Sequence, residues 1–243
     1  MRRGEVLKIL KGRGWLASCD PAFRDAVIES GRLLRFRRGE ALYQPGDVPG
    51  GMFGLAEGGI VLSIPGRNGV PTAAHIVRPS SWFGYGSVFN KQQRMLIPVA
   101  NEPSQVLHLG LSELDKLRAK FPSASQAFWQ LAMRADAGYV AAISDLLIAD
   151  TDRRLAAILL RVTGAETHDR QRDLPIDPLL ADPWAGPNGV PLTQALLGEM
   201  ANASPQTVTR FVDRAVQAGW IVWTYGRVRI LDFRQLLAFA AGK

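Results

Sequence analysis

Residues 192–231, LTQALLGEMANASPQTVTRFVDRAVQAGWIVWTYGRVRIL, decide the fold of the C-terminal part of this 243-residue chain. Their pattern predicts two short helices joined by a tight turn and followed by a β-hairpin. In the second helix, apolar residues recur at the spacing of one buried face: Val208, Phe211, Val212 and Ala215. The opposite face carries side chains that can hydrogen-bond an outside partner: Gln206, Thr209, Arg210, Asp213 and Gln217.

Local signals mark where these helices begin and end. Ser204 is a suitable N-cap, and Pro205 suits the first helical position, where its missing N–H costs nothing. We expect Gly219 to end the helix in the left-handed conformation. Thr193 is the expected cap of the first helix. The apolar face of that first helix consists of Leu196, Leu197 and Met200.

The end of the stretch predicts a hairpin. Short β-type runs at residues 220–223 and 227–231 flank the turn signal Tyr225-Gly226. Helix, turn, polar helix and hairpin together are typical of a winged helix-turn-helix that reads duplex DNA. The alternative is a small helical subdomain whose polar face is only solvated.

The spacing of this stretch resembles the DNA-binding half of the CRP/FNR family of bacterial transcription regulators. The residues that carry the resemblance are Leu192-Thr193, Ser204, Thr207-Val208, Arg210, Gly219 and Ile221. It implies that the second helix enters the major groove, where each base pair presents its own donors and acceptors. A dimer would place two such helices on an approximate inverted repeat.

The chemistry of DNA recognition suggests a role for each polar residue. Arg210 can donate two bonds to a guanine edge, and Gln206 can pair with adenine. The short hydroxyls of Ser204, Thr207 and Thr209 suit contacts with phosphates or bases. In the hairpin, which forms the wing, Tyr225, Arg227 and Arg229 suit contacts with the flanking DNA backbone. The candidate DNA-binding residues are Thr193, Ser204, Gln206, Thr207, Thr209, Arg210, Tyr225 and Arg227. Well-known family members carry arginine and glutamate where this chain has Pro205 and Gln206, so we expect a different preferred DNA sequence.

The amino-acid composition restricts the possible partners and the possible location of the protein. The formal net charge of +7 favours a polyanionic partner, although basic residues are spread along the chain. A single cysteine, Cys19, rules out an intramolecular disulfide framework and fits a reducing cytosol. No segment approaches the roughly 18–20 apolar residues that cross a bilayer, and the N-terminus lacks a signal-peptide pattern. We therefore expect a cytoplasmic protein without a membrane partner.

Residues 33–109 predict an antiparallel β-domain. Short apolar runs at 33–36, 52–55, 60–64, 73–77, 96–100 and 106–109 alternate with turn clusters such as Pro45-Gly46-Asp47. Such even spacing favours a sandwich or a jelly-roll barrel. The order of turns, with one after FRRGEALYQPGD and another after LAEGG, resembles the cyclic-nucleotide-binding fold of the same family.

Helical patterns flank this β-domain. We expect helical structure at residues 5–31, 112–121, 123–149 and 152–162, the last ended by Gly164. Residues 165–191 contain five prolines and predict a loop-rich connection, with short strands near Leu174 and Val190. The long helix carries a coiled-coil-like seam, rich in small side chains, at steps of four and three: Phe128, Ala132, Ala135, Tyr139, Ala142 and Leu146. Periodicity alone fits packing on the barrel equally well; the family resemblance favours a homodimer.

The expected effector pocket differs from that of cyclic-nucleotide-binding members. Those members use a glutamate after a glycine for the ribose, and an Arg-Ser pair for the phosphate. Here Gly84 is followed by Tyr85, and Arg94 by Met95. Tyr85 offers no carboxylate acceptor and Met95 no hydroxyl donor. We therefore expect Arg94 to be a solvated charge, and cyclic AMP not to be the effector.

Other chemistries find little support. An iron–sulfur sensor needs four ligands, usually thiolates, and a single haem-ligating histidine is the most that His75, His108 and His168 suggest. Barrel enzymes need several histidines and a carboxylate around one metal, and no catalytic motif is present. No metal, cofactor or catalytic residue is indicated, and we expect no enzyme. A sensor scaffold that has lost DNA binding, or binds DNA only with its effector, remains the alternative.

The sequence thus predicts an α+β protein in three parts. Residues 1–122 form an N-terminal helix and an effector-type β jelly-roll, residues 123–149 a long dimerisation helix, and residues 150–243 a winged helix-turn-helix domain. The predicted function is a homodimeric, sequence-specific transcription regulator, with duplex DNA as partner and RNA polymerase as a second partner if it activates.

Overall fold

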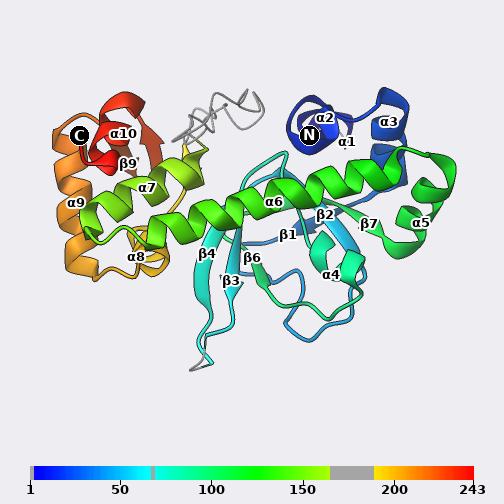
Figure 1. Cartoon of the computed structure of the whole chain (residues 1–243), viewed down its shortest axis with the longest axis horizontal. Coiled ribbons are helices and arrows are strands. Elements are labelled where there is room, and N and C mark those ends of the chain that lie inside the picture. Colours follow the sequence, from blue (N-terminus) through cyan, green and yellow to red (C-terminus); the bar gives the residue numbers. More distant parts are fainter. Residues whose placement is uncertain (1–2, 67–68, 165–188) are drawn as a thin grey trace. The chain divides into compact units, whose positions relative to one another are not determined.

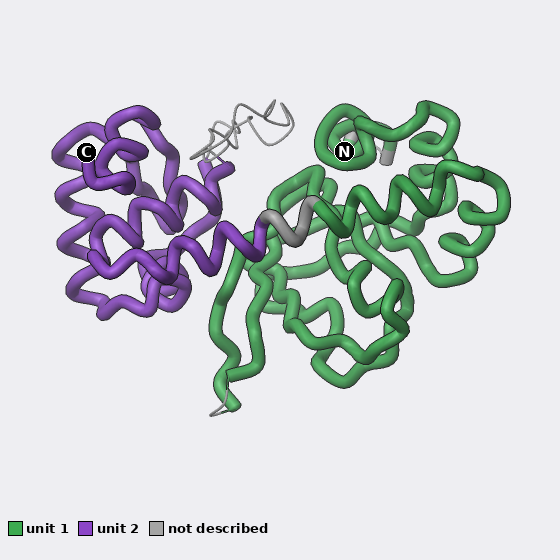
Figure 2. Tube along the Cα trace, viewed as in Figure 1, with its two compact units in different colours: residues 1–137 green, residues 138–243 purple. Residues whose placement is uncertain are grey.

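The computed structural model describes residues 3–66, 69–164 and 189–243 (Figure 1). The chain divides into two compact units, residues 1–137 and residues 138–243 (Figure 2). The first unit holds helices and two β-sheets, and the second is mainly helical. No helix in the described residues is long and apolar enough to cross a membrane.

The N-terminal helical region is broken into three helices: α1 (Arg3–Gly12), α2 (Gly14–Ala17) and α3 (Pro21–Ser30). The first break lies at Gly14, whose φ is +71° and whose missing Cβ would lie 2.5 Å from the Ser80 carbonyl oxygen. Asp20 begins α3, because its carboxylate accepts from the backbone N–H groups of Ala22 and Phe23. The predicted helical character of residues 5–31 is confirmed, with these interruptions.

Two antiparallel sheets form the β-domain. The first has the order β1-β7-β2-β5, and the second the order β4-β3-β6. The strands are β1 (Arg32–Phe36), β2 (Gly51–Glu57), β3 (Ile60–Ile64), β4 (Thr72–Val77), β5 (Trp82–Phe83), β6 (Ile97–Ala100) and β7 (Ser104–Gly110). Buried side chains from both sheets, including Leu55, Ile60 and Val106, form one apolar cluster. The antiparallel β-domain predicted for residues 33–109 is confirmed, and a short helix that was not predicted, α4 (Tyr85–Asn90), lies within it.

A second core joins the N-terminal helices to α5 (Leu111–Lys120) and the first half of α6 (Ala124–Leu146). The Trp15 ring stacks on Phe128 with 5.8 Å between centroids, and Trp15 Nε1 donates a 2.7 Å hydrogen bond to the Ala127 carbonyl. Phe23 meets Phe128 edge-on. Phe128 is only 3% exposed within its own unit, so its assignment to a subunit interface was wrong. The N-terminal helices cover that face of α6.

The second unit begins with the end of α6 and continues with α7 (Thr151–Thr163), which Asp150 caps and Gly164 ends at φ +74°. It also contains β8 (Val190–Pro191), α8 (Gln194–Ala201), α9 (Pro205–Gln217), β9 (Ile221–Thr224), β10 (Arg227–Ile230) and α10 (Phe233–Ala241). The three strands form a small antiparallel sheet in the order β8-β10-β9. The predicted strand near Val190 is confirmed, and the one near Leu174 lies outside the described residues. The helix α10 was not predicted.

Candidate nucleic-acid interface

Both ends of α9 are fixed by the residues that the sequence indicates. The Ser204 hydroxyl accepts a 3.2 Å bond from the Thr207 N–H, and Pro205 takes the first helical position. At the other end, Gly219 has a φ of +72° and its N–H bonds to the Val216 carbonyl. The Trp220 N–H bonds to the Ala215 carbonyl, which completes a Schellman motif. These caps hold α9 in one defined length and direction.

One side of α9 is buried and the other faces solvent. Val208 and Phe211 are 0% exposed, as the predicted stripe requires. The turn before α9 is tight: Asn202 adopts a left-handed φ of +48°, and a Cβ on Gly198 would lie 3.2 Å from the Ala203 carbonyl oxygen. Packing against α8 therefore forces the opposite, polar face of α9 outward.

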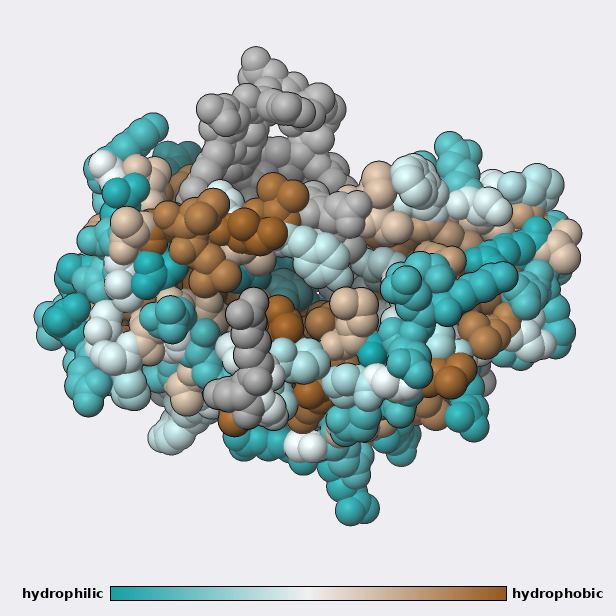
Figure 3. All heavy atoms as spheres, turned by 60° about the horizontal axis from the view of Figure 1, so that its bottom comes forward, coloured by the Kyte–Doolittle hydropathy of each residue, from teal (hydrophilic) through white to brown (hydrophobic). Residues whose placement is uncertain are grey.

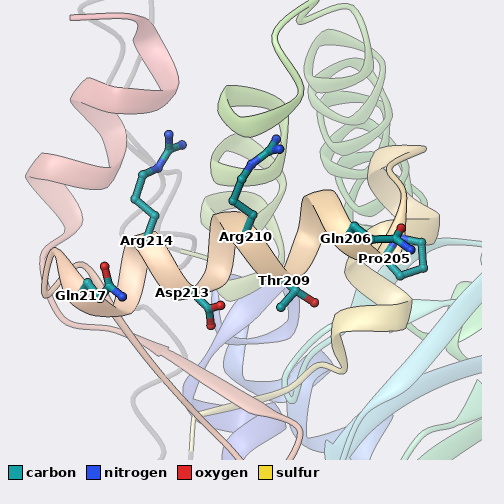
Figure 4. A pocket seen from close by; sticks show the side chains of 7 residues that line it. All are labelled: Pro205, Gln206, Thr209, Arg210, Asp213, Arg214 and Gln217. Carbon is teal, nitrogen blue, oxygen red and sulfur yellow. The ribbon is translucent and has the colours of Figure 1, made fainter.

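A shallow hollow runs along this exposed face (Figure 4). It is lined by Pro205, Gln206, Thr209, Arg210, Asp213, Arg214 and Gln217. Figure 4 shows Arg210 and Arg214 projecting to one side of the helix, and Thr209 and Asp213 to the other. The surface therefore offers cationic donors along one edge and acceptors along the other.

The two arginines are held differently. Arg214 donates a 2.9 Å bond to Asp152 Oδ2 and lies 4.8 Å from the centre of the Phe239 ring. Arg210 Nη2 lies 3.8 Å from Asp152 Oδ1, too far for a hydrogen bond, and its side chain is 71% exposed. The guanidinium of Arg210 is therefore accessible from the solvent. The predicted sites included neither Asp152 nor Arg214. Asp152 comes from α7, and no local signal in the sequence links it to α9.

The other predicted DNA-binding residues of the helices either have exposed side chains or belong to the helix caps. Gln206 is exposed, and the Thr209 hydroxyl donates a 3.1 Å bond to Gln194 Oε1 while its side chain stays exposed. Thr193 caps α8, since its hydroxyl accepts from the Leu196 N–H at 3.2 Å. Ser204 and Thr207 bond each other through their hydroxyls at 3.0 Å. These caps and hydroxyl pairs position backbone N–H groups as well as side chains.

The predicted hairpin is confirmed. Thr224 pairs with Arg227, so Tyr225 and Gly226 form a two-residue turn with positive φ angles of 49° and 73°. Positive φ at both positions is the pattern of a type I′ turn. The Tyr225 side chain is fully exposed at the tip. Arg227 instead donates a 2.8 Å bond to the Gly189 carbonyl, which fixes its guanidinium beside the sheet.

The predicted effector pocket of the β-domain holds the largest departure from expectation. Arg94 is only 4% exposed, so its interpretation as a solvated charge was wrong. Its guanidinium donates to the backbone carbonyls of Gly84 and Gly51. It also lies over the Tyr43 ring, 4.3 Å from the centroid. Burial lowers the pKa of Arg94 from its usual value.

The four predicted pocket residues do not share one site. Gly84 adjoins Arg94: its φ is +76°, and a Cβ there would lie 3.0 Å from Arg94 Nη1. Tyr85 instead packs with Phe89 against the helical core. Met95 is 67% exposed at the surface. Gly84 and Arg94 are thus in contact, whereas Tyr85 packs against the helical core and Met95 lies at the surface.

Apolar side chains are exposed on α6, and most of them lie outside the predicted seam. On the face of the molecule that Figure 3 shows, brown, apolar atoms lie at the surface among hydrophilic ones. The exposed apolar residues of α6 and its end are Trp129, Met133, Tyr139, Val140, Ile143, Leu146 and Leu147. Five of them lie outside the predicted seam: Trp129 and Met133 in the first unit, and Val140, Ile143 and Leu147 in the second. Of the predicted seam, Tyr139 and Leu146 are exposed and Ala132 and Ala142 partly buried; Ala135 lies outside the described side chains.

Comparison with known proteins agrees with this architecture. Residues 33–121 match the family model described as a cyclic nucleotide-binding domain, and residues 153–239 match the Crp-like helix-turn-helix domain. The chain therefore combines a cyclic-nucleotide-binding-type β-domain with a helix-turn-helix domain. It belongs to the CRP/FNR family of transcription regulators.

Solved structures share the fold. A CRP-family transcriptional regulator from Thermus thermophilus has a TM-score of 0.63 at 20% identity, covering 86% of this chain and 96% of its own. A putative cyclic nucleotide binding protein from Ruegeria pomeroyi has a TM-score of 0.65 at 16% identity, covering 100% of both chains. The c-di-GMP responsive regulator CLP of Xanthomonas campestris reaches 0.60 at 12% identity, covering 87% and 99%. No curated protein matches the chain in sequence.

Proposed function

We propose that the chain is a homodimeric regulator that recognises an inverted-repeat DNA site through α9. The observation that carries this proposal is the exposed, hydrogen-bonding face of α9, with Arg210 71% exposed at its middle. A capped helix of this length fits the major groove, and an exposed arginine can donate two bonds to guanine. Ser204 and Thr207 at its N-terminus suit a phosphate oxygen, since backbone N–H groups point outward there.

The dimer would form through the exposed apolar residues of α6. Trp129, Met133, Val140, Ile143 and Leu147 follow the spacing by which two helices pack side by side. Large apolar side chains exposed in this pattern favour a protein partner. A second copy of α6 supplies the matching stripe in a two-fold dimer.

The free protein should bind DNA without cyclic AMP. Two of the guanidinium donors of Arg94 are already bonded to the carbonyls of Gly84 and Gly51, and the side chain is buried. No carboxylate follows Gly84 to accept a ribose hydroxyl, since Tyr85 stands there. The residues therefore do not fit cyclic AMP. The alternative function is a sensor for another small molecule, with DNA binding lost or strictly dependent on that molecule.

The test is a selection from random duplex DNA with the purified protein, performed with and without cyclic AMP. We expect the same inverted repeat to be enriched in both conditions. Enrichment only with cyclic AMP would overturn the interpretation of Arg94 and Tyr85. No enrichment in either condition would favour the sensor alternative. If the protein activates transcription, RNA polymerase becomes a second partner, and recruitment to the selected site would be measured by transcription in vitro.

A further inference from the structure

We infer that Asp152 sets the DNA specificity of Arg210, although it lies on α7 and outside α9. This inference rests on the proposed function and adds a positioning residue to it. Asp152 Oδ2 binds Arg214 at 2.9 Å, while Asp152 Oδ1 faces Arg210 at 3.8 Å. The Oδ1 atom is buried and has no hydrogen-bond partner in the described residues. One carboxylate thus acts on both arginines of the exposed helix face.

The two arginines receive different roles from this arrangement. Arg214 is fixed by a hydrogen bond to Asp152 and by the ring of Phe239 on α10, so it joins three helices. Arg210 has no such bond to Asp152, and its exposed guanidinium can donate to a partner. Asp152 is only 17% exposed, so its charge is poorly screened by water close to Arg210.

The nearby carboxylate discriminates between the two kinds of DNA group that Arg210 can bind. A phosphate oxygen carries negative charge, and Asp152 repels it at short range. A guanine edge is neutral and offers the O6 and N7 acceptors, so the same repulsion is much weaker. Asp152 therefore weakens phosphate contacts, which every DNA sequence supplies, more than the guanine contact, which only the cognate site supplies.

The experiment measures equilibrium binding of Asp152→Asn to the selected inverted repeat and to a scrambled duplex, over a range of salt concentrations. Asparagine keeps the shape of the side chain and removes its charge. We expect tighter binding to the scrambled duplex, an unchanged or slightly weaker affinity for the selected site, and a ratio of the two affinities that falls by a factor of about 10. The salt dependence on scrambled DNA should steepen by about one counterion, because Arg210 gains a phosphate contact.

Asp213→Asn is the matched control, because it removes the same charge from α9 on the side away from Arg210 (Figure 4). It should strengthen binding to both duplexes alike. A second control is Asp152→Asn combined with Arg210→Gln. The ratio of the two affinities should be the same for this double variant as for Arg210→Gln alone. Circular dichroism of each variant establishes that the fold is kept.

Each outcome decides the inference. Equal changes on both duplexes for Asp152→Asn would overturn it and leave only a general electrostatic effect. The inference would also be overturned if Asp152→Asn still changed the ratio of the two affinities when Arg210 is replaced by Gln. If the unaltered protein shows no sequence preference, the proposed function fails together with the inference. If it shows a preference that Asp152→Asn leaves intact, the inference alone fails.

Discussion

The carboxylate of Asp145 on α6 accepts a 2.7 Å hydrogen bond from Nε of Arg161 on α7, and both side chains are nearly excluded from solvent. Their exposed fractions are 2% and 8%. This pair fixes the last turn of α6 to the helix from which Asp152 projects. Removal of one partner would take this ion pair away from the other buried charge, which is costly.

We expect Asp145→Leu to lower the free energy of unfolding by about 3–5 kcal/mol, because the buried Arg161 loses this ion pair. Urea unfolding followed by circular dichroism measures this loss. The double variant with Arg161→Met should recover most of the stability, since neither charge is then buried. A single variant as stable as the unaltered protein would show that the pair does not hold these helices together.

The stability of the first unit should depend on pH through His108. Burial lowers the pKa of His108 from its ordinary value of 6.5. The unfolded chain therefore takes up this proton first as the pH falls, and the free energy of unfolding decreases from about pH 6.5 downward. His108→Gln should reduce this dependence. Urea titrations at several pH values give the slope of the free energy of unfolding against pH for the unaltered protein and for His108→Gln. Identical slopes would rule out His108 as the source of the pH dependence.

Close packing of α8 on α9 should limit the size of residue 198. A Cβ on Gly198 would lie 3.3 Å from Val208 Cγ2 and 3.2 Å from the Ala203 carbonyl oxygen. We expect Gly198→Val to destabilise the protein by about 1–3 kcal/mol through overpacking. Gly198→Ala should change stability less, because the helix propensity of alanine offsets the contact. Gly138→Ala, which meets nothing within 4 Å, is the control and should not destabilise.

Dimerisation should depend on the exposed residues of α6. Ile143 is 59% exposed, and a charge at its position in a helix pair would be buried against apolar neighbours. We expect Ile143→Asp to raise the dimer dissociation constant at least about 30-fold, measured by analytical ultracentrifugation. Val48→Asp, at an even more exposed position outside α6, should leave the dimer intact. A dimer unaffected by Ile143→Asp would exclude this stripe as the interface.

Much of the second unit was predictable because its signals are local. Ser204 and Pro205 specify where α9 begins, and Gly219 specifies where it ends, without reference to any distant residue. The alternation of apolar runs likewise predicted the strands. The helix α10 was not predicted although it carries signals of the same kind, since Asp232 caps its N-terminus and Gly242 ends it at a φ of +74°.

The candidate sites were less predictable where their geometry comes from tertiary contacts. Arg94 is surrounded by Gly51, Gly84 and Tyr43, which lie far from it in sequence, and nothing local indicates its burial. The burial of Phe128 on α6 was not predictable, because periodicity cannot tell which face of this helix the N-terminal helices cover. In the structure Phe128 packs on Trp15, whereas the neighbouring Trp129 is exposed.

The most direct test of DNA reading by α9 is the affinity of Arg210→Ala for the selected site and for a scrambled duplex. We expect a loss of about 1–3 kcal/mol on the selected site, relaxed preference at one base position, and a much smaller loss on scrambled DNA. Arg229→Ala in the wing is the comparison, and should weaken binding to both duplexes alike. Equal losses for Arg210→Ala on the two duplexes would contradict base reading by α9 and reduce Arg210 to a phosphate contact.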